Sequence, residues 1–273
     1  LNWRLDFKFL SKLVRSQIVK LIRFSFQENN SWGVLEGDSV FSVTGSVYGN
    51  FEKGEKVCSL SEVKLLAPAE PKIMVCVGVN FKNATNADGD TVAVERSCPK
   101  CFFKPASTLS DPFSGVEYPV NAKDPHLEVE LCVVIKKKAK NLTIDEVSDY
   151  VLGYTCGNEL GAMDYIREDN NVTRGRGFDT SGPLGPHLET ELDTSNLALT
   201  SRVNGEVVQE GNTDMMIFNP LEVVKHVTSF ITLQPGDVVW TGTPQGRSPV
   251  KIGDKMEVEV EGIGILENEV LPY

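Results

Sequence analysis

The segment from residue 127 to residue 135, LEVELCVVI, constrains the fold of this chain more than any other. Every residue in it is apolar except two glutamates, and such a run without turn residues predicts a buried strand. Because successive side chains of a strand point to opposite faces, Glu128 and Glu130 share one face. If that face is buried, the two carboxylates need a cation such as Mg²⁺, Mn²⁺ or Ca²⁺ beside them. A half-exposed strand with its acidic face in water is the alternative, and these two residues alone do not decide between them.

A third carboxylate follows another apolar strand. Residues 153–157, GYTCG, predict a buried strand that ends at Asn158-Glu159. Glu159 could therefore join Glu128 and Glu130 in one site. Three acids with few other ligands would leave positions on a bound metal open to substrate, and such a site suits Lewis-acid polarisation of a carbonyl or enolate.

Strand patterns dominate the rest of the chain. They predict short strands and turns over residues 20–70, buried strands at 73–77 and 238–241, a short strand at 101–105, and an alternating hairpin after Gly253 that closes the sheet. The fold class expected from them is α+β, predominantly β.

Helix signals are few. A capping box at Thr143 predicts a helix to about Val151, and Asn219-Pro220 starts a second helix that stops before Leu233. The proline-rich linker 65–72 separates a small N-terminal β-rich module, residues 20–70, from a larger domain, residues 71–273.

Charge and hydropathy argue against several classes of partner. The 273 residues carry 27 lysines and arginines against 38 aspartates and glutamates, a formal charge of −11. Such a surface repels nucleic acid and anionic membranes, and no run approaches the roughly 20 apolar residues of a membrane helix. We therefore expect no nucleic-acid or membrane partner.

The start of the chain differs, because residues 1–23 are basic and amphipathic. This pattern predicts either an organelle transit segment or an extension ahead of a true start near Lys20, and residues 1–19 are left out of the fold prediction. A cytoplasmic protein is expected, or a mitochondrial one if the segment directs transit.

Six cysteines raise the question of a zinc or redox site. Cys98 and Cys101 have the C-x-x-C spacing of a zinc half-site or redox pair. A structural zinc needs two further ligands, and no second C-x-x-C or H-x-x-x-H pattern supplies them. Free thiols in a reducing compartment are the favoured interpretation.

Six motifs follow one another in the larger domain: LEVELCVVI, GYTCGNEL, RGFDTSGPLGP, VNGEVVQEGNTDMMIF, ITLQPGDVVWTGTPQG and KIGDKMEVEVEGIG. Together they resemble the C-terminal domain of the fumarylacetoacetate hydrolase family over roughly residues 72–272. The resemblance implies a mixed β-roll fold, a homodimer, and a Mg²⁺ or Mn²⁺ ion held by Glu128, Glu130 and Glu159. The third ligand is normally an aspartate, so the extra methylene here moves that carboxylate by about 1.5 Å.

The resemblance also implies roles for other side chains. Arg176 stands where the family has a lysine that holds substrate oxygens, and its planar fork should change that contact. Lys104 matches a lysine that could line the site, and Thr243 matches a residue whose hydroxyl meets a bound carboxylate. The family's S-A-R-D stretch reads GAMD here, which loses an arginine and keeps Asp164. These matches predict catalytic roles for Lys104, Arg176 and Asp164, and substrate binding by Thr243 and Arg176.

The largest departure from the family lies in a polar, turn-prone stretch, residues 82–97, which predicts a mobile loop. Ala84 and Ala87 stand where the family has a His-Glu pair that activates water. General-base catalysis contributes about 10²–10⁴-fold in rate, so a conventional hydrolase would lose its main water activator.

The prediction from these residues is a metal-dependent enzyme that polarises a small 2-oxo acid or 1,3-dicarbonyl compound as its enolate. Tautomerisation, isomerisation, decarboxylation and ring closure need no activated water, and they are favoured for that reason. Hydrolysis of a C–C bond in a fumarylacetoacetate- or acylpyruvate-type substrate is the close alternative. A catalytically inactive dimeric binding protein is the third.

Overall fold

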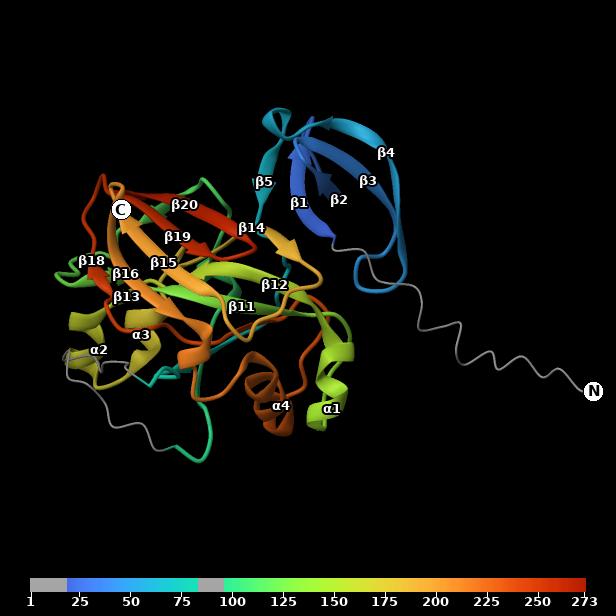
Figure 1. The fold of residues 1–273 in the computed structure, drawn as a ribbon. Helices are drawn as coiled ribbons and strands as arrows, with labels where there is room; N and C mark the ends of the chain where they lie inside the picture. The colour runs from blue at the N-terminus through green and yellow to red at the C-terminus, as the bar shows by residue number, and fades with distance from the viewer. Residues whose placement is uncertain (1–18, 83–95) are drawn as a thin grey trace, which may run out of the picture.

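The computed structural model describes residues 19–82 and 96–273. Strands dominate and helices are few, which confirms the α+β, predominantly β class (Figure 1). The five strands of the N-terminal module are β1 (Lys20–Phe26), β2 (Asn29–Glu36), β3 (Ser39–Gly45), β4 (Phe51–Ser59) and β5 (Lys64–Leu66). They agree with the short strands and turns that the sequence predicts for this part of the chain.

One long sheet runs through the module and the main body. Its order is β4-β3-β2-β1-β14-β12-β11-β17-β6-β7, with β5 paired to β1 and β8 paired to β14. Its main-body strands are β6 (Met74–Gly78), β7 (Lys100–Lys104), β8 (Leu109–Ser110), β11 (Val129–Ile135), β12 (Val151–Asn158), β14 (Gly182–Glu189) and β17 (Val238–Trp240). The β17–β6 and β8–β14 pairs are parallel and the others are antiparallel, so the sheet is mixed.

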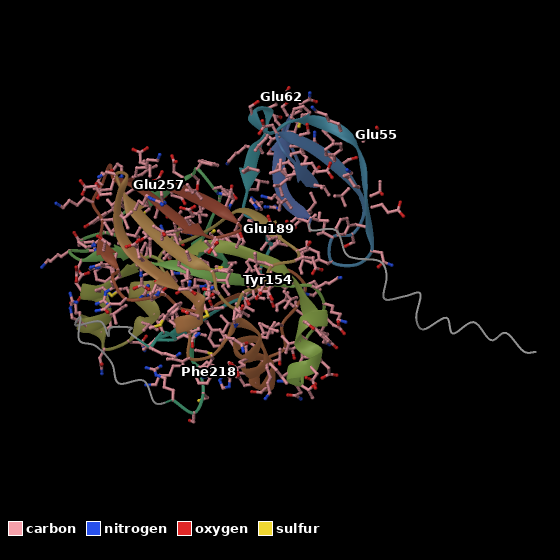
Figure 2. The ribbon with its side chains drawn as sticks, viewed as in Figure 1. Glu55, Glu62, Tyr154, Glu189, Phe218 and Glu257 are labelled. Carbon is pink, nitrogen blue, oxygen red and sulfur yellow. The ribbon has the colours of Figure 1, made fainter. Side chains whose placement is uncertain are left out.

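Strand β1 joins the module to the main body. Lys20 and Leu21 pair with Glu189 and Leu188 of β14. Glu189 therefore marks the place where the two parts meet (Figure 2). The module extends the main sheet at this point and does not form a sheet of its own.

Two smaller sheets complete the main body, with the orders β16-β15-β19-β20-β9 and β13-β10-β18. Their strands are β9 (Gly115–Glu117), β10 (Pro125–Leu127), β13 (Gly161–Ala162), β15 (Ala198–Val203), β16 (Glu206–Asn212), β18 (Ser248–Pro249), β19 (Lys255–Val260) and β20 (Gly264–Leu271). The prediction that the C-terminal hairpin closes the main sheet is wrong. The hairpin is β19 and β20 of the five-stranded sheet, and its alternating pattern suits a sheet with only one buried face.

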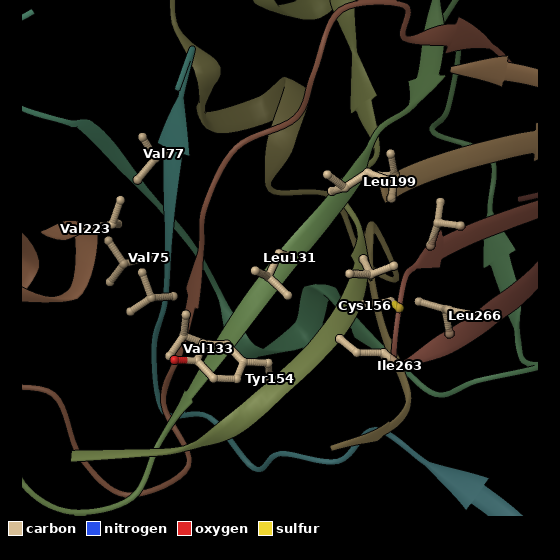
Figure 3. Close-up of a cluster of buried hydrophobic side chains, with 14 of the residues drawn as sticks. Val75, Val77, Leu131, Val133, Tyr154, Cys156, Leu199, Val223, Ile263 and Leu266 are labelled. Carbon is tan, nitrogen blue, oxygen red and sulfur yellow. The ribbon is translucent and has the colours of Figure 1, made fainter. Parts of the chain in front are cut away.

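The main core lies between the long sheet and the five-stranded sheet. Leu131 and Val133 of β11 pack there in one cluster with Leu199 and Leu266 of the smaller sheet (Figure 3). On the other face of β11, Cys132 and Val134 belong to a second buried cluster. All residues of β11 are buried, which explains why its sequence is apolar on both faces apart from Glu130.

In residues 19–82 and 96–273, four short α-helices lie around the sheets: α1 (Ile144–Val147), α2 (Met163–Asp169), α3 (Val172–Arg176) and α4 (Pro220–Phe230). The capping box predicted at Thr143 begins α1, and α4 begins at the predicted Asn219-Pro220, where the structure also has a capping box. Helix α1 is shorter than predicted, because residues 148–150 form a 3₁₀ turn and β12 already begins at Val151. Within the described residues, no helix has both the length and the apolar character needed to cross a membrane.

Candidate metal and substrate site

The three predicted acids meet at one end of the β11–β12 pair. Val129 and Glu130 pair with Asn158 and Gly157, so the residue after β12 lies beside the residue before β11. The Glu159 N–H donates to the Glu128 carbonyl at 2.9 Å. Ligand atoms of the three glutamates all lie within 4.8 Å of one another, and each residue is at most 3% exposed.

The apolar run predicted as one strand from residue 127 to 135 is divided at Glu128. Strand β10 before it belongs to the three-stranded sheet and β11 after it to the long sheet. At the break, side-chain oxygens accept the backbone hydrogen bonds that a neighbouring strand would otherwise accept. The Glu128 N–H donates to Asn158 Oδ1 at 3.2 Å, and the Val129 N–H donates to Gln209 Oε1 at 3.0 Å. The break leaves the Glu128 carboxylate beside the other two even though the strand does not continue through it.

Two cations neutralise part of this acidic cluster. Arg176 Nη2 donates to Glu128 Oε1 at 2.8 Å, while its Nη1 donates to the Glu159 carbonyl at 3.0 Å and pairs with Glu159 Oε2. Lys104 Nζ donates to Glu159 Oε1 at 2.9 Å and also to the carbonyls of Arg176 and Ser181. Each Glu159 oxygen therefore has a cationic partner.

Gly161 makes room for the arginine. A Cβ atom at this position would stand 2.7 Å from Arg176 Nη1 and 2.8 Å from its Cζ. Contacts this short are not tolerated, so any side chain at residue 161 would push the guanidinium away from the acids. The position of the Arg176 guanidinium beside the acids therefore requires glycine at residue 161.

The charges of the cluster are not balanced. Burial raises the pKa of the Glu130 carboxyl well above its usual range, and Glu159 and Glu128 raise it further, while the Gly242 N–H at 2.8 Å lowers it. Burial also raises the pKa of Glu159, in spite of the lowering effect of Arg176 and Lys104. Burial alone would lower the pKa of Arg176, but Glu128 and Glu159 raise it.

This donor set fits a hard divalent cation. Glu128, Glu130 and Glu159 offer carboxylate oxygens, which Mg²⁺ and Mn²⁺ prefer. Burial, together with neighbouring carboxylates, raises the pKa of Glu130 and of Glu159, so a further cation would stabilise the ionised cluster. Within residues 19–82 and 96–273, this is the only group of three or more such side chains close enough to hold one ion.

The acids open onto a cavity of about 170 Å³. Its other described lining residues include the polar side chains Arg176, Thr243 and Arg247, and the apolar side chains Val79, Phe102, Ile166 and Val172. The cavity is therefore large enough for a small organic acid and offers it both polar and apolar contacts.

The predicted substrate-binding and catalytic residues differ in how they relate to this cavity. Thr243 lines it, but its Oγ1 donates to the Val129 carbonyl at 2.9 Å and accepts from Gln209 Nε2 at 2.8 Å. A bound carboxylate would have to replace that carbonyl as the acceptor. Lys104 is 1% exposed and is not among the lining residues, so the structure places it behind Glu159.

Asp164 is also outside the set of lining residues. It lies in the first turn of α2, where Oδ2 accepts a bond from the Lys123 N–H at 2.8 Å. This position gives Asp164 a role in the entry to the helix, and the catalytic role predicted for it has no support in the geometry. Ala84 and Ala87, which replace the family's His-Glu pair, lie outside the described residues.

Sequence reasoning did not single out several residues at the site, among them Val79, Gln209 and Arg247. Gln209 is 2% exposed and bonds both the strand break and Thr243. It lies within one of the six family motifs, but the alternation of its strand gives no sign that Gln209 is buried, because its neighbour Val207 is 51% exposed. Arg247 lies in a polar turn where one more charged residue is unremarkable.

Comparison with known proteins gives two family matches. Residues 73–271 match the model described as fumarylacetoacetate (FAA) hydrolase C-terminal, and residues 19–68 match the one described as Rv2993c-like, N-terminal. The chain is 37% identical to the mitochondrial oxaloacetate tautomerase Fahd2a of Rattus norvegicus, over 77% of this chain and 70% of that protein.

Solved structures agree with these matches. The 2-hydroxyhepta-2,4-diene-1,7-dioate isomerase of Mycobacterium marinum superposes with a TM-score of 0.85 and 32% identity, covering 93% of this chain and 98% of that one. The fumarylacetoacetate hydrolase of Exiguobacterium antarcticum superposes with a TM-score of 0.80 and 28% identity, covering 93% and 100%. With the three-acid site in place on this fold, the chain belongs to the fumarylacetoacetate hydrolase family.

Proposed function

We propose that this protein is a divalent-metal-dependent tautomerase or isomerase that interconverts the keto and enol forms of a small 2-oxo acid or 1,3-dicarbonyl compound. The observation that carries the proposal is the buried cluster of Glu128, Glu130 and Glu159 on the wall of a small cavity. Relatives named as an oxaloacetate tautomerase and a hydroxyheptadienedioate isomerase support this class of reaction. When bound by the three glutamates, Mg²⁺ or Mn²⁺ would supply Lewis acidity for a substrate oxygen.

The chain's own residues hold and complete this site. Lys104 and the Gly242 N–H fix the carboxylates of Glu159 and Glu130. Arg176 presents a guanidinium to the same cavity and can donate to a substrate oxygen. Apolar side chains such as Phe102 and Ile166 also line the cavity, and a substrate that displaces water from them would strengthen the electrostatic interactions at the acids.

Tautomerisation is favoured over hydrolysis because it needs no activated water. None of the described residues that line the cavity is a histidine. The same enolate chemistry would serve decarboxylation or ring closure, so these reactions belong to the same proposal. Homodimeric assembly is proposed with it.

The test uses metal-stripped protein. Thermal unfolding is followed during titration with Mn²⁺ and Mg²⁺, and the loss of enol absorbance is followed with oxaloacetate, for the wild type, Glu130→Gln, and the control Glu55→Gln. Glu55 is exposed on β4, far along the sheet from the site (Figure 2). An ion at 100 times its Kd should stabilise the wild type and the control by about 2.7 kcal/mol.

Enol loss should be at least roughly 100-fold faster with metal in the wild type and the control, and Glu130→Gln should lose both effects. Metal-dependent cleavage of an acylpyruvate without enol–keto relaxation would show a C–C hydrolase instead. No metal response in any of the three proteins would overturn the enzyme proposal and favour a non-catalytic binding protein.

A further inference from the structure

The polar side chain of Gln209 in β16 is buried, and an irregularity of the strand puts it there. The pairing of β16 with β15 shifts by one residue between Ser201 and Arg202, and Val208 is the extra residue opposite this shift. In a regular strand Val207 and Gln209 would share a face, but Val207 is 51% exposed and Gln209 is 2% exposed. The bulge therefore turns the amide of Gln209 inward.

Two backbone groups fix which end of the Gln209 amide carries the oxygen. The Val129 N–H can only donate, and Gln209 Oε1 accepts from it at 3.0 Å. The Pro244 carbonyl can only accept, and Gln209 Nε2 donates to it at 2.8 Å. The opposite orientation would bring two donors together at Val129 and two acceptors together at Pro244. The amide therefore has one orientation that satisfies both groups.

The second hydrogen of Gln209 Nε2 determines the direction of the Thr243 hydroxyl. Gln209 Nε2 donates to Thr243 Oγ1 at 2.8 Å, so the hydroxyl oxygen is the acceptor in that bond. The single hydrogen of the hydroxyl is then directed to the Val129 carbonyl, at an oxygen–oxygen distance of 2.9 Å. Because Thr243 lines the cavity, this hydrogen can be donated to a ligand in place of the Val129 carbonyl, or shared between the two.

A hydroxyl with a fixed direction favours one kind of ligand atom. A carboxylate or enolate oxygen can only accept, so it matches the hydrogen that Thr243 has to give. Hydrogen bonds to an ionised acceptor are roughly twice as strong as those between neutral groups. A donor that is already oriented also needs no reorganisation when the ligand binds. The Thr243 hydroxyl is therefore arranged to receive an anionic oxygen.

We propose that Gln209 is a positioning residue for substrate binding. Its amide fixes the Thr243 hydroxyl as a donor and thereby sets the affinity of this part of the cavity for an anionic oxygen of the substrate. Gln209 is absent from the described residues that line the cavity, so it acts through Thr243. The inference rests on the proposed function, because the oxygen concerned belongs to the substrate of the same site.

Two substitutions separate this role from a purely structural one at the strand break. Gln209→Glu keeps an acceptor for the Val129 N–H, but its second oxygen, once ionised, can only accept. The Thr243 hydroxyl must then donate to that oxygen and is turned away from the substrate. Gln209→Met is similar in size and removes the acceptor for Val129, but it leaves the Thr243 hydroxyl able to donate to a ligand. A structural role predicts that Gln209→Met is the more damaging change, and the positioning role predicts the reverse.

The test measures kcat and KM for loss of the oxaloacetate enol by Mn²⁺-loaded protein. Both Gln209 variants are made with and without Thr243→Val, and the control Gln245→Glu adds the same charge to an exposed side chain two residues from Thr243. We expect KM to rise about tenfold in Gln209→Glu and in Thr243→Val, and about threefold or less in Gln209→Met and in the control.

Two further readouts depend on the direction of the hydroxyl. The rise in KM for Gln209→Glu should be larger at about pH 8.5 than at about pH 6, because the introduced carboxyl ionises as pH rises. Because the bond from Thr243 is present both before and during the reaction, kcat should change by about twofold or less. In the Thr243→Val background, Gln209→Glu should raise KM by about twofold or less, because there is no hydroxyl left to turn.

Three results would overturn the inference. If Gln209→Glu raises KM equally with and without the Thr243 hydroxyl, or less than Gln209→Met does, Gln209 acts only through the strand break. If Thr243→Val alone leaves KM unchanged, the hydroxyl does not meet the substrate. In both cases an active wild type leaves the proposed function standing. If the metal-loaded wild type does not accelerate loss of the enol, both the inference and the proposed function fail.

Discussion

Two of the places in the main body that bury carboxylates, Asp237 and the acidic cluster, do so in opposite ways. Asp237, at the start of β17, is 1% exposed. Its Oδ1 accepts from the Lys72 and Ile73 N–H groups at 2.9 and 3.0 Å, and its Oδ2 accepts from the Gln234 N–H at 2.7 Å. The acidic cluster of Glu128, Glu130 and Glu159 is buried as deeply but holds three carboxylates together.

The difference lies in what completes each site. Backbone N–H groups satisfy both oxygens of Asp237, so the fold itself provides every partner it needs. In the acidic cluster, Lys104 and Arg176 offset part of the charge, and the pKa values of Glu130 and Glu159 are still raised. Burial of an acid is therefore no sign of function by itself. Burial of acids whose charge the chain does not fully compensate is a sign of function, because such a cluster needs a cation from outside the chain.

The largest expected change in stability comes from a substitution of Asp237. Asp237→Asn keeps one acceptor oxygen but turns an NH₂ group toward a backbone N–H, so buried donors lose their partners. The free energy of unfolding should fall by about 2–4 kcal/mol. Urea denaturation measures it, with the exposed turn substitution Asp38→Asn as the control. A loss as small as that of the control would mean that Asp237 is not the fixed anchor described here.

The same kind of change in the acidic cluster should act with the opposite sign. In metal-free protein at pH 7.5, Glu130→Gln removes a repelled charge and keeps an acceptor for the Gly242 N–H. We expect the free energy of unfolding to rise by about 1 kcal/mol, an ordinary size for a single substitution, because burial and the neighbouring carboxylates disfavour the charged form of Glu130 and raise its pKa. Urea denaturation of metal-stripped samples checks this. Destabilisation as large as that of Asp237→Asn would erase the distinction between the two regions.

The fold and the acids could be predicted because they depend on local pattern. The run around Leu131 is apolar on both faces because its strand is central, and the capping box at Asn219 fixes a helix start without distant partners. The three glutamates follow from strand periodicity and from the family resemblance.

What could not be predicted depends on contacts between distant segments. The strand breaks at Glu128 because the side chains of Asn158 and Gln209 accept the hydrogen bonds that a neighbouring strand would otherwise accept. Asn158 is 30 positions from Glu128 in the chain, and Gln209 is 80 positions from Val129. The left-handed turn at Val79 is imposed by bonds from its neighbour to residues far along the sequence. The alternation of apolar and polar residues and the spacing of motifs are local patterns, so they do not reveal such long-range contacts.

The pH dependence of stability sharpens the comparison further. The pKa of Glu130 is raised in the folded state, so folding retains a proton that the unfolded chain releases above about pH 4.5. The contribution of this group is therefore present at low pH and is lost as pH rises through the folded pKa. The stability of metal-free wild type relative to Glu130→Gln should therefore fall as pH rises from about 4.5 through the folded pKa. A difference that stays constant over this range, in paired denaturation curves, would contradict the raised pKa.

The smallest effect concerns the cation that the chain itself supplies to the cluster. Gly161→Ala would place a methyl group against the Arg176 guanidinium and the Met163 Cε, which are both ends of flexible side chains and can move. Stability of the metal-free protein should fall by only about 1 kcal/mol, since an ion pair is loosened but not deleted. Because Arg176 holds one oxygen each of Glu128 and Glu159, its displacement should free them and tighten Mn²⁺ binding.

A tightening of about three- to tenfold, or about 0.7–1.4 kcal/mol, is expected by titration calorimetry. Gly49→Ala is the matched control, because its added methyl group meets only ordinary contacts at 3.8 Å or more. If Gly161→Ala binds Mn²⁺ as the control does, Arg176 does not compete with the metal for these oxygens. The cluster would then accept both cations at once, and its need for outside charge would be larger than the metal-free arrangement suggests.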